Sequence, residues 1–448
     1  MQYAQLTNKG DFFLTVFFVT FGCKVNCYET ECLKEEFLNN NFILADNETN
    51  TDVIIINSCT VTSASDKKVR QTMRRLRIEN PSSIIVLTGC YPQAFSEEAK
   101  KITEADLITG TKNRSDIIKL VMSELRSRKH MVDIVPYENN DKIESLSCIS
   151  FENKTRAFVK IQDGCNQFCS YCIIPYSRGR IRSKPINDVI SEVTALAANG
   201  HKEIVLVGIN LAFYGAEYGL SLTDAVEECC KIEGVRRVRL GSLEPEKISD
   251  SDLIRLSKLD KFCPQFHLSL QSGCDRTLKA MNRKYISAEY EELVRKIRTF
   301  FIDSSVTTDV MVGFPDETES DFSQSCEFVR KMKFSKINVF PYSRRSGTKA
   351  ASMPCQITKK VKTLRAGKMT LIGNELEKEF LHEQIGKIYP VLFEKENCTE
   401  FHQGYSPNYT LVKINRSDSI KSLRNKIFYV KIKKSMNDFC IGEIQITE

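Results

Sequence analysis

The chain has 448 residues, of which 42% are hydrophobic and 27% charged, so it is long enough for several domains with ordinary cores. Its 17 cysteines are spread along a chain that opens without a signal-peptide pattern. This argues against a secreted disulfide framework and favours reduced thiols or metal ligands. The net charge of +7 is compatible with nucleic-acid binding but does not require it.

The first third of the chain alternates apolar runs of strand length with helical patterns. The expected strands are residues 12–21, 53–57, 84–88 and 106–109, and the alternation predicts a parallel α/β domain over residues 11–135. The first run is too short to span a bilayer and is interrupted by threonines, so we interpret it as a buried strand.

Three cysteines, Cys23, Cys59 and Cys90, each follow one of these strands closely. Because ligands gather at the carboxyl ends of parallel strands, this placement predicts a three-cysteine metal site. The alternative is that all three are simply small buried residues. Cys27 is close enough to Cys23 to be a spare ligand, but we predict that it is not one, and Cys32 is expected to pack within a helix.

The helix expected after Cys59 is strongly basic. Val69, Met73 and Leu76 form a stripe that faces the core, and no acidic residue lies between positions 67 and 77. The basic face is either a solvated surface or a contact for a phosphate backbone. The candidate RNA contacts on it are Arg70, Arg74, Arg75 and Arg77.

The loop Cys165–Cys172 carries three cysteines, Cys165, Cys169 and Cys172, in the spacing C-x3-C-x2-C. Four ligands close an ordinary iron–sulfur cluster or a structural zinc site. Three ligands on a four-iron cluster leave one iron open to bind and activate a small molecule. A zinc site with a distant fourth ligand is the alternative.

From residue 157 the alternation of strands and helices resumes. The expected strands are 157–162, 203–209, 236–241, 265–270, 305–312 and 336–341, which suggests an open, incomplete (β/α) barrel within residues 151–375. Its active site should lie at the carboxyl ends of the strands. The candidate cofactor-binding residues at those ends are Gly208, Asn210, Ser242, Glu244, Gln271 and Asp309.

The pattern changes again over residues 376–448. Runs at 388–393, 409–414, 427–432 and 441–447 predict a small antiparallel β-barrel. Basic residues are frequent between Leu411 and Ser435, and Lys413 and Lys431 are candidate RNA contacts because such barrels often bind nucleic acid. Phe401, Tyr405 and Tyr409 are either base-stacking residues or core aromatics.

The loop motif resembles that of radical S-adenosylmethionine (SAM) enzymes, in which the open iron binds SAM and an aromatic residue, here Tyr171, usually precedes the last cysteine. The whole chain resembles the radical SAM methylthiotransferases. That resemblance implies an N-terminal methylthiotransferase domain, a radical SAM core and a C-terminal TRAM domain. It also implies SAM and two 4Fe-4S clusters, one held by Cys23, Cys59 and Cys90 and the other by Cys165, Cys169 and Cys172.

The residues near the cysteines indicate a subfamily. Gly22-Cys23-Lys24-Val25-Asn26, Cys59-Thr60-Val61-Thr62 and Thr88-Gly89-Cys90-Tyr91 resemble members that modify N6-threonylcarbamoyladenosine at position 37 of tRNA. Ser58, Cys27 and Pro92 depart from the usual pattern without removing a ligand. The resemblance implies radical methylthiolation of the adenine C2, with no catalytic residues beyond the cluster ligands.

The expected partners are the anticodon stem-loop of tRNA and an electron donor such as flavodoxin or ferredoxin. We expect a cytoplasmic monomer with no membrane attachment. Two alternatives of the same enzyme type act on isopentenyladenosine-37 or on a ribosomal protein side chain. An alternative of another class is a non-catalytic iron–sulfur protein that binds RNA or senses redox state.

Overall fold

The computed structural model describes residues 13–151, 154–394, 400–416 and 422–445. By their internal contacts, these residues divide into two compact units. The N-terminal unit comprises the described residues of 1–148 together with 172–180, and the second unit comprises those of 149–171 and 181–448. The short segment 172–180 therefore belongs to the N-terminal unit, although the chain on both sides of it belongs to the second.

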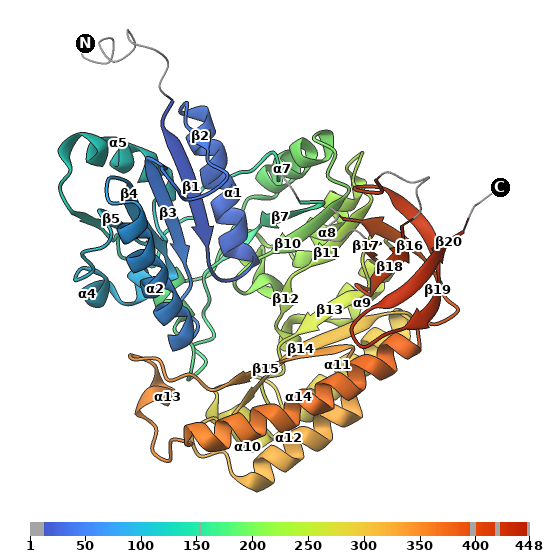
Figure 1. The fold of residues 1–448 in the computed structure, drawn as a ribbon. Helices are drawn as coiled ribbons and strands as arrows, with labels where there is room; N and C mark the ends of the chain where they lie inside the picture. The colour runs from blue at the N-terminus through green and yellow to red at the C-terminus, as the bar shows by residue number, and fades with distance from the viewer. Residues whose placement is uncertain (1–12, 152–153, 395–399, 417–421, 446–448) are drawn as a thin grey trace. The chain divides into compact units, whose positions relative to one another are not determined.

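The N-terminal unit is a six-stranded parallel sheet with the order β2-β1-β3-β4-β5-β6 (Figure 1). Its strands are β1 (Thr15–Thr20), β2 (Ile43–Leu44), β3 (Val53–Ser58), β4 (Ile84–Gly89), β5 (Leu107–Thr109) and β6 (Met131–Asp133). Its helices are α1 (Lys24–Asn39), α2 (Ser63–Glu79), α3 (Cys90–Ala94), α4 (Ser96–Ala99), α5 (Ile117–Ser127) and α6 (Ile174–Arg178).

Both faces of this sheet are covered. Ile55 of β3 packs with Leu33 of α1 and Val121 of α5, whereas its neighbour Ile54 packs with Val69 of α2 on the other face. Successive residues of a strand point to opposite faces, so a strand buried on both sides is apolar at every position. This is why β3 and β4 appear in the sequence as continuous apolar runs.

The second unit contains two parallel sheets that form an open (β/α) arrangement. One has the order β11-β10-β7 and the other the order β12-β13-β14-β15. The strands are β7 (Arg156–Lys160), β10 (Glu203–Val207), β11 (Arg237–Leu240), β12 (Ser242–Leu243), β13 (Gln265–Leu268), β14 (Ser305–Val312) and β15 (Lys336–Pro341), with a small hairpin of β8 (Gln162–Asp163) and β9 (Arg182–Ser183).

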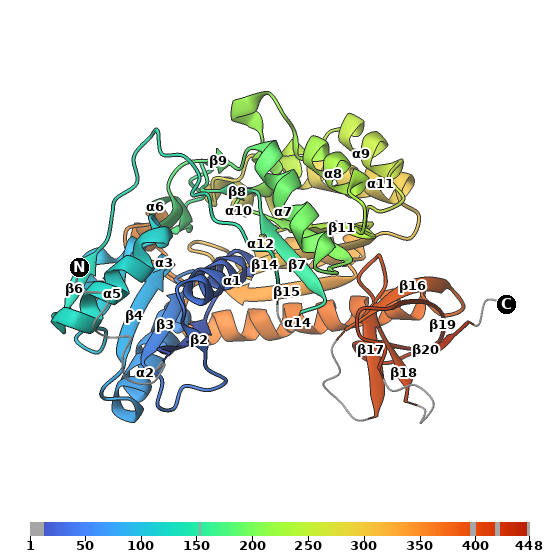
Figure 2. The same cartoon turned by 90° about the horizontal axis from the view of Figure 1, so that it is seen from above.

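The helices of the second unit alternate with these strands. They are α7 (Ile186–Ala198), α8 (Leu222–Lys231), α9 (Asp250–Ser257), α10 (Asp275–Ala280), α11 (Ser287–Phe300), α12 (Glu319–Met332), α13 (Lys349–Ser352) and α14 (Lys359–His382). Ser249 and Thr318 start α9 and α12 with capping boxes, in which Asp252 and Asp321 return the hydrogen bond. Figure 2 shows α14 running beneath β15. Gly373 lies so close to Ile337 of β15 that an added Cβ would be 3.3 Å from the Ile337 Cβ.

The chain ends in a closed barrel with the order β16-β17-β18-β20-β19. Its strands are β16 (Ile388–Phe393), β17 (Phe401–Tyr405), β18 (Leu411–Asn415), β19 (Ile427–Ser435) and β20 (Cys440–Ile444). The expectation of a purely antiparallel barrel is wrong in one respect, because β18 and β20 pair in parallel. A ring with an odd number of strands cannot alternate direction at every pair.

The fold class expected from the sequence is confirmed: a parallel α/β domain, an open (β/α) barrel and a small β-barrel. The helix α14 continues through residue 376, where the sequence suggested a domain boundary, and the barrel begins only at Ile388. Within the described ranges, no helix combines the length and apolar character needed to cross a bilayer.

Candidate metal centres

Three cysteines follow the carboxyl ends of neighbouring strands in the N-terminal sheet. Cys23 precedes α1, Cys59 follows β3 directly, and Cys90 is the first residue of α3 after β4. The chain runs from β1 to β2 on one side, while β3 lies on the other side of β1, so the strand order reverses here. Parallel α/β sheets bind ligands at such points. The cysteines thus lie where the alternation of elements predicts, and their role as ligands stays a prediction.

Two glycines allow these turns to approach one another. Gly22 has a φ of +116°, and an added Cβ would lie 2.9 Å from the Cβ of Cys59. Gly89 has a φ of +102°, and an added Cβ would lie 2.5 Å from the Ser58 carbonyl oxygen. A side chain at either position would be strained and would push Cys23 or Cys90 away from Cys59.

The thiols of this group lie close enough to influence one another. Burial raises the pKa of the Cys59 thiol to about 12, and the neighbouring Cys90 and Cys23 add to the rise. Within the described residues, no three His, Cys, Asp or Glu side chains converge on a point that could hold a single metal ion. A four-iron cluster does not need such convergence, because each thiolate binds a different iron. Three cysteine thiols are ligands of the kind that hold an iron–sulfur cluster.

The other cysteines of this region lie apart from the strand ends. The Cys27 backbone N–H donates to the Cys23 carbonyl in the first turn of α1, and its side chain is half-buried. Cys32 is 1% exposed within the core, as its predicted packing role requires, and Cys148 is also buried.

A buried polar network that the sequence did not reveal surrounds Cys90. The Arg178 Nε donates to the Cys90 Sγ at 3.3 Å, and its Nη2 donates to Asn26 Oδ1 and Glu29 Oε2, each at 3.0 Å. The Cys23 Sγ lies 3.5 Å from the same Asn26 Oδ1. Arg178 was missed because no sequence pattern connects it with residues 88 to 152 positions away.

In the second unit, the sulfurs of Cys165 and Cys169 accept hydrogen bonds. Asn210 Nδ2 lies 3.5 Å from Cys165 Sγ, and the Gln167 backbone N–H donates to the same sulfur at 3.4 Å. The Arg283 Nη1 donates to Cys169 Sγ at 3.3 Å. Such donors stabilise thiolates that hold a cluster. Burial raises the pKa of the free Cys165 thiol to about 11, so metal binding must displace its proton.

Several of the candidate cofactor-binding residues predicted at the carboxyl ends of the strands lie around these sulfurs. Gly208 follows β10 and packs closely against Gln162. A Cβ added to Gly208 would lie 2.8 Å from Gln162 Oε1. That oxygen also accepts the backbone N–H of Asn210 at 2.7 Å. Glu244 pairs with the buried Arg283, which also donates to the Cys169 sulfur. Gly208, Asn210 and Glu244 are thus brought to the cysteine loop.

The remaining candidate cofactor-binding residues lie along the sheet β12-β13-β14-β15 or next to it. Gln271 has a φ of +66° and donates its backbone N–H to the Asp309 carbonyl at 2.8 Å. The Asp309 carboxylate lies 3.2 Å from His267 Nε2 and accepts from Asn338 at 3.0 Å. Ser242 is exposed at the start of β12. Tyr171 packs beside an apolar cluster that includes Met281, Phe314 and Tyr342.

Two protein families match the chain. Residues 15–110, which contain Cys23, Cys59 and Cys90, match the Uncharacterized protein family UPF0004, and residues 159–329, which contain the cysteine loop, match the Radical SAM superfamily. A threonylcarbamoyladenosine tRNA methylthiotransferase MtaB of Bacillus subtilis is 35% identical over 94% of this chain and 94% of its own length. The chain belongs to the radical SAM tRNA methylthiotransferase family. Its radical SAM membership implies one 4Fe-4S cluster and SAM.

Other relatives in this family carry two different names. MtaB of Aquifex aeolicus is 36% identical over 86% of this chain and 94% of its own length. A tRNA-2-methylthio-N(6)-dimethylallyladenosine synthase of Caldicellulosiruptor saccharolyticus is 33% identical over 96% of this chain and 92% of its own. Among solved structures, the radical SAM methyltransferase TsrM of Kitasatospora setae superposes with a TM-score of 0.58 at 12% identity, covering 76% of this chain and 74% of its own. That likeness shows the fold alone.

The basic face of α2 carries less unpaired positive charge than its sequence suggests, because acidic side chains from other segments form ion pairs with its arginines. Arg74 pairs with Glu104 and Arg75 with Glu48. The Arg74 side chain nevertheless remains 67% exposed and that of Arg75 49% exposed.

Two further arginines of α2 have structural partners. Arg77 binds Asp106 and donates to the carbonyls of Glu104, Pro81 and Ser83. Arg70 donates to the Tyr91 hydroxyl at 3.1 Å. These contacts support the fold, so they weigh against Arg77 as an RNA contact.

Two aromatic residues at the C-terminal barrel, Tyr405 and Tyr409, already pack against other side chains of the protein. Tyr405 and Tyr409 stack with ring centroids 4.5 Å apart, and the Arg156 guanidinium lies over both rings. Of the alternatives open from the sequence, this favours core aromatics over base-stacking residues. The Lys413 Nζ lies 3.9 Å from the Phe439 ring centroid. Lys431 of β19 is in register with Ile388 on the adjacent strand β16.

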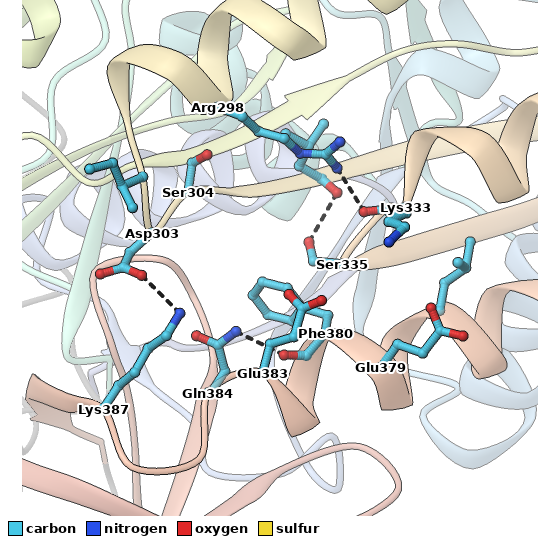
Figure 3. A pocket seen from close by; sticks show the side chains of 13 residues that line it. Arg298, Asp303, Ser304, Lys333, Ser335, Glu379, Phe380, Glu383, Gln384 and Lys387 are labelled. Carbon is cyan, nitrogen blue, oxygen red and sulfur yellow. Dashed lines mark hydrogen bonds and ion pairs between the residues drawn. The ribbon is translucent and has the colours of Figure 1, made fainter.

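A cavity of about 270 Å³ opens at the opposite ends of the strands, near the start of β14 (Figure 3). Three of the charged side chains in its wall, Arg298, Asp303 and Lys387, have hydrogen-bond or ion-pair partners. Lys387 pairs with Asp303 at 2.8 Å, and Arg298 donates to the carbonyls of Met332 and Lys333 at the end of α12. The cavity therefore gives no reason to move the candidate site from the carboxyl ends of the strands.

Proposed function

We propose that this protein methylthiolates C2 of N6-threonylcarbamoyladenosine at position 37 of tRNA, just 3′ of the anticodon. Overall identity does not select this substrate. Relatives named MtaB are 35–36% identical to the chain, and those named dimethylallyladenosine synthases are 33–36% identical. The choice therefore rests on residues at the candidate site.

The observation that carries the proposal is the signature Gly22-Cys23-Lys24-Val25-Asn26 and its place in the structure. Asn26 Nδ2 donates to the Ser58 carbonyl at 3.0 Å and lies 3.3 Å from Asn57 Oδ1. The segment whose residues resemble the threonylcarbamoyladenosine subfamily is thus bound to the turn that carries Cys59. It shapes the immediate surroundings of the sulfur chemistry.

The two cysteine sets would hold two 4Fe-4S clusters, Cys23, Cys59 and Cys90 one of them and Cys165, Cys169 and Cys172 the other. When bound, the clusters and SAM supply the radical, sulfur and methyl chemistry that side chains cannot provide. The chain's own groups bind and orient. Among the described residues, Asn210 Oδ1 and Glu246 Oε2 are buried acceptors without a partner, suited to the ammonium group of an amino-acid cofactor.

For the tRNA, we propose phosphate contacts by the exposed Arg74 and Arg75, with Lys413 and Lys431 as further candidates. Phosphate contacts give affinity with little choice of sequence, so selection of the modified base must come from the site itself. We also propose that the enzyme is a cytoplasmic monomer. It would receive electrons from a donor such as flavodoxin or ferredoxin.

The proposal is tested by giving the reconstituted, reduced enzyme three substrates in separate reactions. These are tRNA with threonylcarbamoyladenosine, tRNA with isopentenyladenosine, and ribosomal protein. Mass spectrometry of nucleosides and peptides should find a methylthio product only with the first. A product only with the second would transfer the chain to the dimethylallyladenosine subfamily, and no product with any substrate, together with no SAM cleavage, would support a non-catalytic iron–sulfur protein.

A further inference from the structure

The segment 172–180 connects the two proposed cluster sites along the chain. Cys172 is the last cysteine of the loop, and α6 begins two residues later and ends at Arg178. The segment is fixed within the N-terminal unit, where Thr111 Oγ1 donates to the Ser177 carbonyl. Arg178 itself is completely buried there.

The Arg178 guanidinium is held by three different kinds of acceptor. The Glu29 carboxylate forms a bidentate ion pair with it. Asn26 Oδ1 accepts a hydrogen bond from Nη2 at 3.0 Å, and the Cys90 sulfur accepts one from Nε at 3.3 Å. Through Asn26, whose Oδ1 lies 3.5 Å from the Cys23 sulfur, the same group also reaches a second cysteine. The cation thus contacts one of the three proposed ligands directly, Cys90, and is linked to a second, Cys23, only through the Asn26 side chain.

The sulfur is the acceptor whose charge changes when a cluster binds. A thiol is a weak acceptor, whereas a thiolate is a charged one that forms stronger bonds with a guanidinium. The bond to Cys90 therefore strengthens in the loaded state. Hydrogen bonds to cluster sulfurs and nearby charge are also among the factors that set a cluster's reduction potential.

We propose that Arg178 is a positioning residue for the N-terminal cluster: it holds the Cys90 thiolate and raises the reduction potential of that cluster. The direction follows from charge, because a cation beside the ligand stabilises the reduced, more negative cluster. The inference rests on the proposed function, since it requires a cluster on Cys23, Cys59 and Cys90.

The test isolates this cluster by working in a full-length Cys165→Ala/Cys169→Ala/Cys172→Ala chain. Into it we introduce Arg178→Gln, Arg178→Lys or Arg114→Gln. Arg114 is the matched control, because it is also buried and pairs with the same Glu29 at 3.0 Å. It further contacts the Thr111 carbonyl and the Glu144 carboxylate, which are oxygen acceptors and not cysteine sulfurs. Iron content, thermal unfolding and the midpoint of a redox titration followed by electron paramagnetic resonance are measured for each.

Arg178→Gln should lower the midpoint potential, Arg178→Lys should restore part of it, and Arg114→Gln should leave it unchanged. If Arg178→Gln loses iron that Arg114→Gln retains, the positioning role is also supported. An unchanged potential in Arg178→Gln, or equal effects of Arg178→Gln and Arg114→Gln on potential or iron, would overturn it in favour of a purely structural ion pair. Absence of iron from the parent chain would instead contradict the proposed second cluster.

Discussion

Glu203 at the start of β10 accepts a hydrogen bond from Arg239 of β11 at 2.8 Å, and both side chains are only 1% exposed. Arg237 approaches the same carboxylate at 3.4 Å and donates to the Tyr405 carbonyl at 2.8 Å. Arg239 in turn donates to the Pro407 carbonyl at 2.9 Å. One carboxylate thus fixes two arginines that bind the C-terminal barrel to the radical SAM sheet.

Glu203→Gln should destabilise this junction strongly. It leaves buried guanidinium groups without their charge partner, which typically costs about 3–5 kcal/mol of unfolding free energy. Urea unfolding followed by circular dichroism measures the difference. Glu97→Gln is the control, because Glu97 is 79% exposed and its pair with Lys100 should contribute little. Equal stabilities of the two variants would contradict the role assigned to Glu203.

The same ion pair predicts a pH dependence. Burial alone would raise the pKa of Glu203, but Arg239, Arg237 and Arg156 outweigh it and hold the pKa below its ordinary value. A carboxyl with a lowered folded-state pKa stabilises the fold above its unfolded pKa of about 4.3, and that contribution is lost as the pH falls through the folded value. The stability gap between wild type and Glu203→Gln should therefore be full at pH 7 and shrink below about pH 4. A constant gap would show that Glu203 stays charged or acts only through packing.

Iron content should separate the two proposed clusters. Anaerobically reconstituted wild type should hold about eight irons, and Cys59→Ala and Cys169→Ala should each hold about four. Cys27→Ala is the matched control, since Cys27 lies only four residues from Cys23 yet occupies the first turn of α1, and it should retain all eight. Unchanged iron in Cys59→Ala would remove the N-terminal cluster from the mechanism.

The two cysteine sets should also divide the chemistry. A Cys23→Ala/Cys90→Ala enzyme should still cleave SAM to 5′-deoxyadenosine, because that step needs only the loop Cys165–Cys172, but it should deliver no sulfur to tRNA. Chromatography of 5′-deoxyadenosine and mass spectrometry of the tRNA nucleosides report the two steps separately. Methylthio product from this variant would show that the N-terminal cysteines are not the sulfur site.

Patterns confined to one segment were readable from the sequence. The strand-end cysteines, six of the seven described strands in the two parallel sheets of the second unit, and the barrel strands at 388–393 and 427–432 follow from apolar runs and their spacing. The two-residue strand β12 was not predicted. The strand β17 was missed because His402, Gln403 and Gly404 interrupt any apolar alternation. Gly404 is needed there, since an added Cβ would lie 2.4 Å from the Leu392 carbonyl oxygen.

Long-range pairings could not be predicted in this way. Arg178 lies in a basic run that continues with Arg180 and Arg182, and Arg283 stands beside Lys284, but neither local pattern indicates a sulfur as partner. Only folding brings these two arginines to the sulfurs of Cys90 and Cys169. For the same reason the sequence does not show that the basic residues of α2 are partly neutralised, because Glu48, Glu104 and Asp106 come from segments outside the helix.

The ion pairs of α2 show which of its arginines to test for tRNA binding. Arg74→Ala/Arg75→Ala removes two exposed charges whose surface ion pairs are weak, so the fold should be nearly unaffected. If both contact phosphates, affinity for different tRNA species should fall alike, and the slope of log K against log salt should flatten by about one for each lost contact. Filter binding over a range of salt concentrations measures both.

Two comparisons make this result specific. Lys119→Ala/Arg126→Ala removes the same charge from α5, on the opposite face of the sheet, and should leave the salt slope unchanged. Arg77→Ala should instead lower stability, by about 1.5–3 kcal/mol for the lost charged hydrogen bonds, without a specific change in slope. Uncoupled SAM cleavage should persist in the Arg74→Ala/Arg75→Ala enzyme. Equal slopes for the α2 and α5 variants would mean that α2 is a solvated surface and that the tRNA is bound elsewhere.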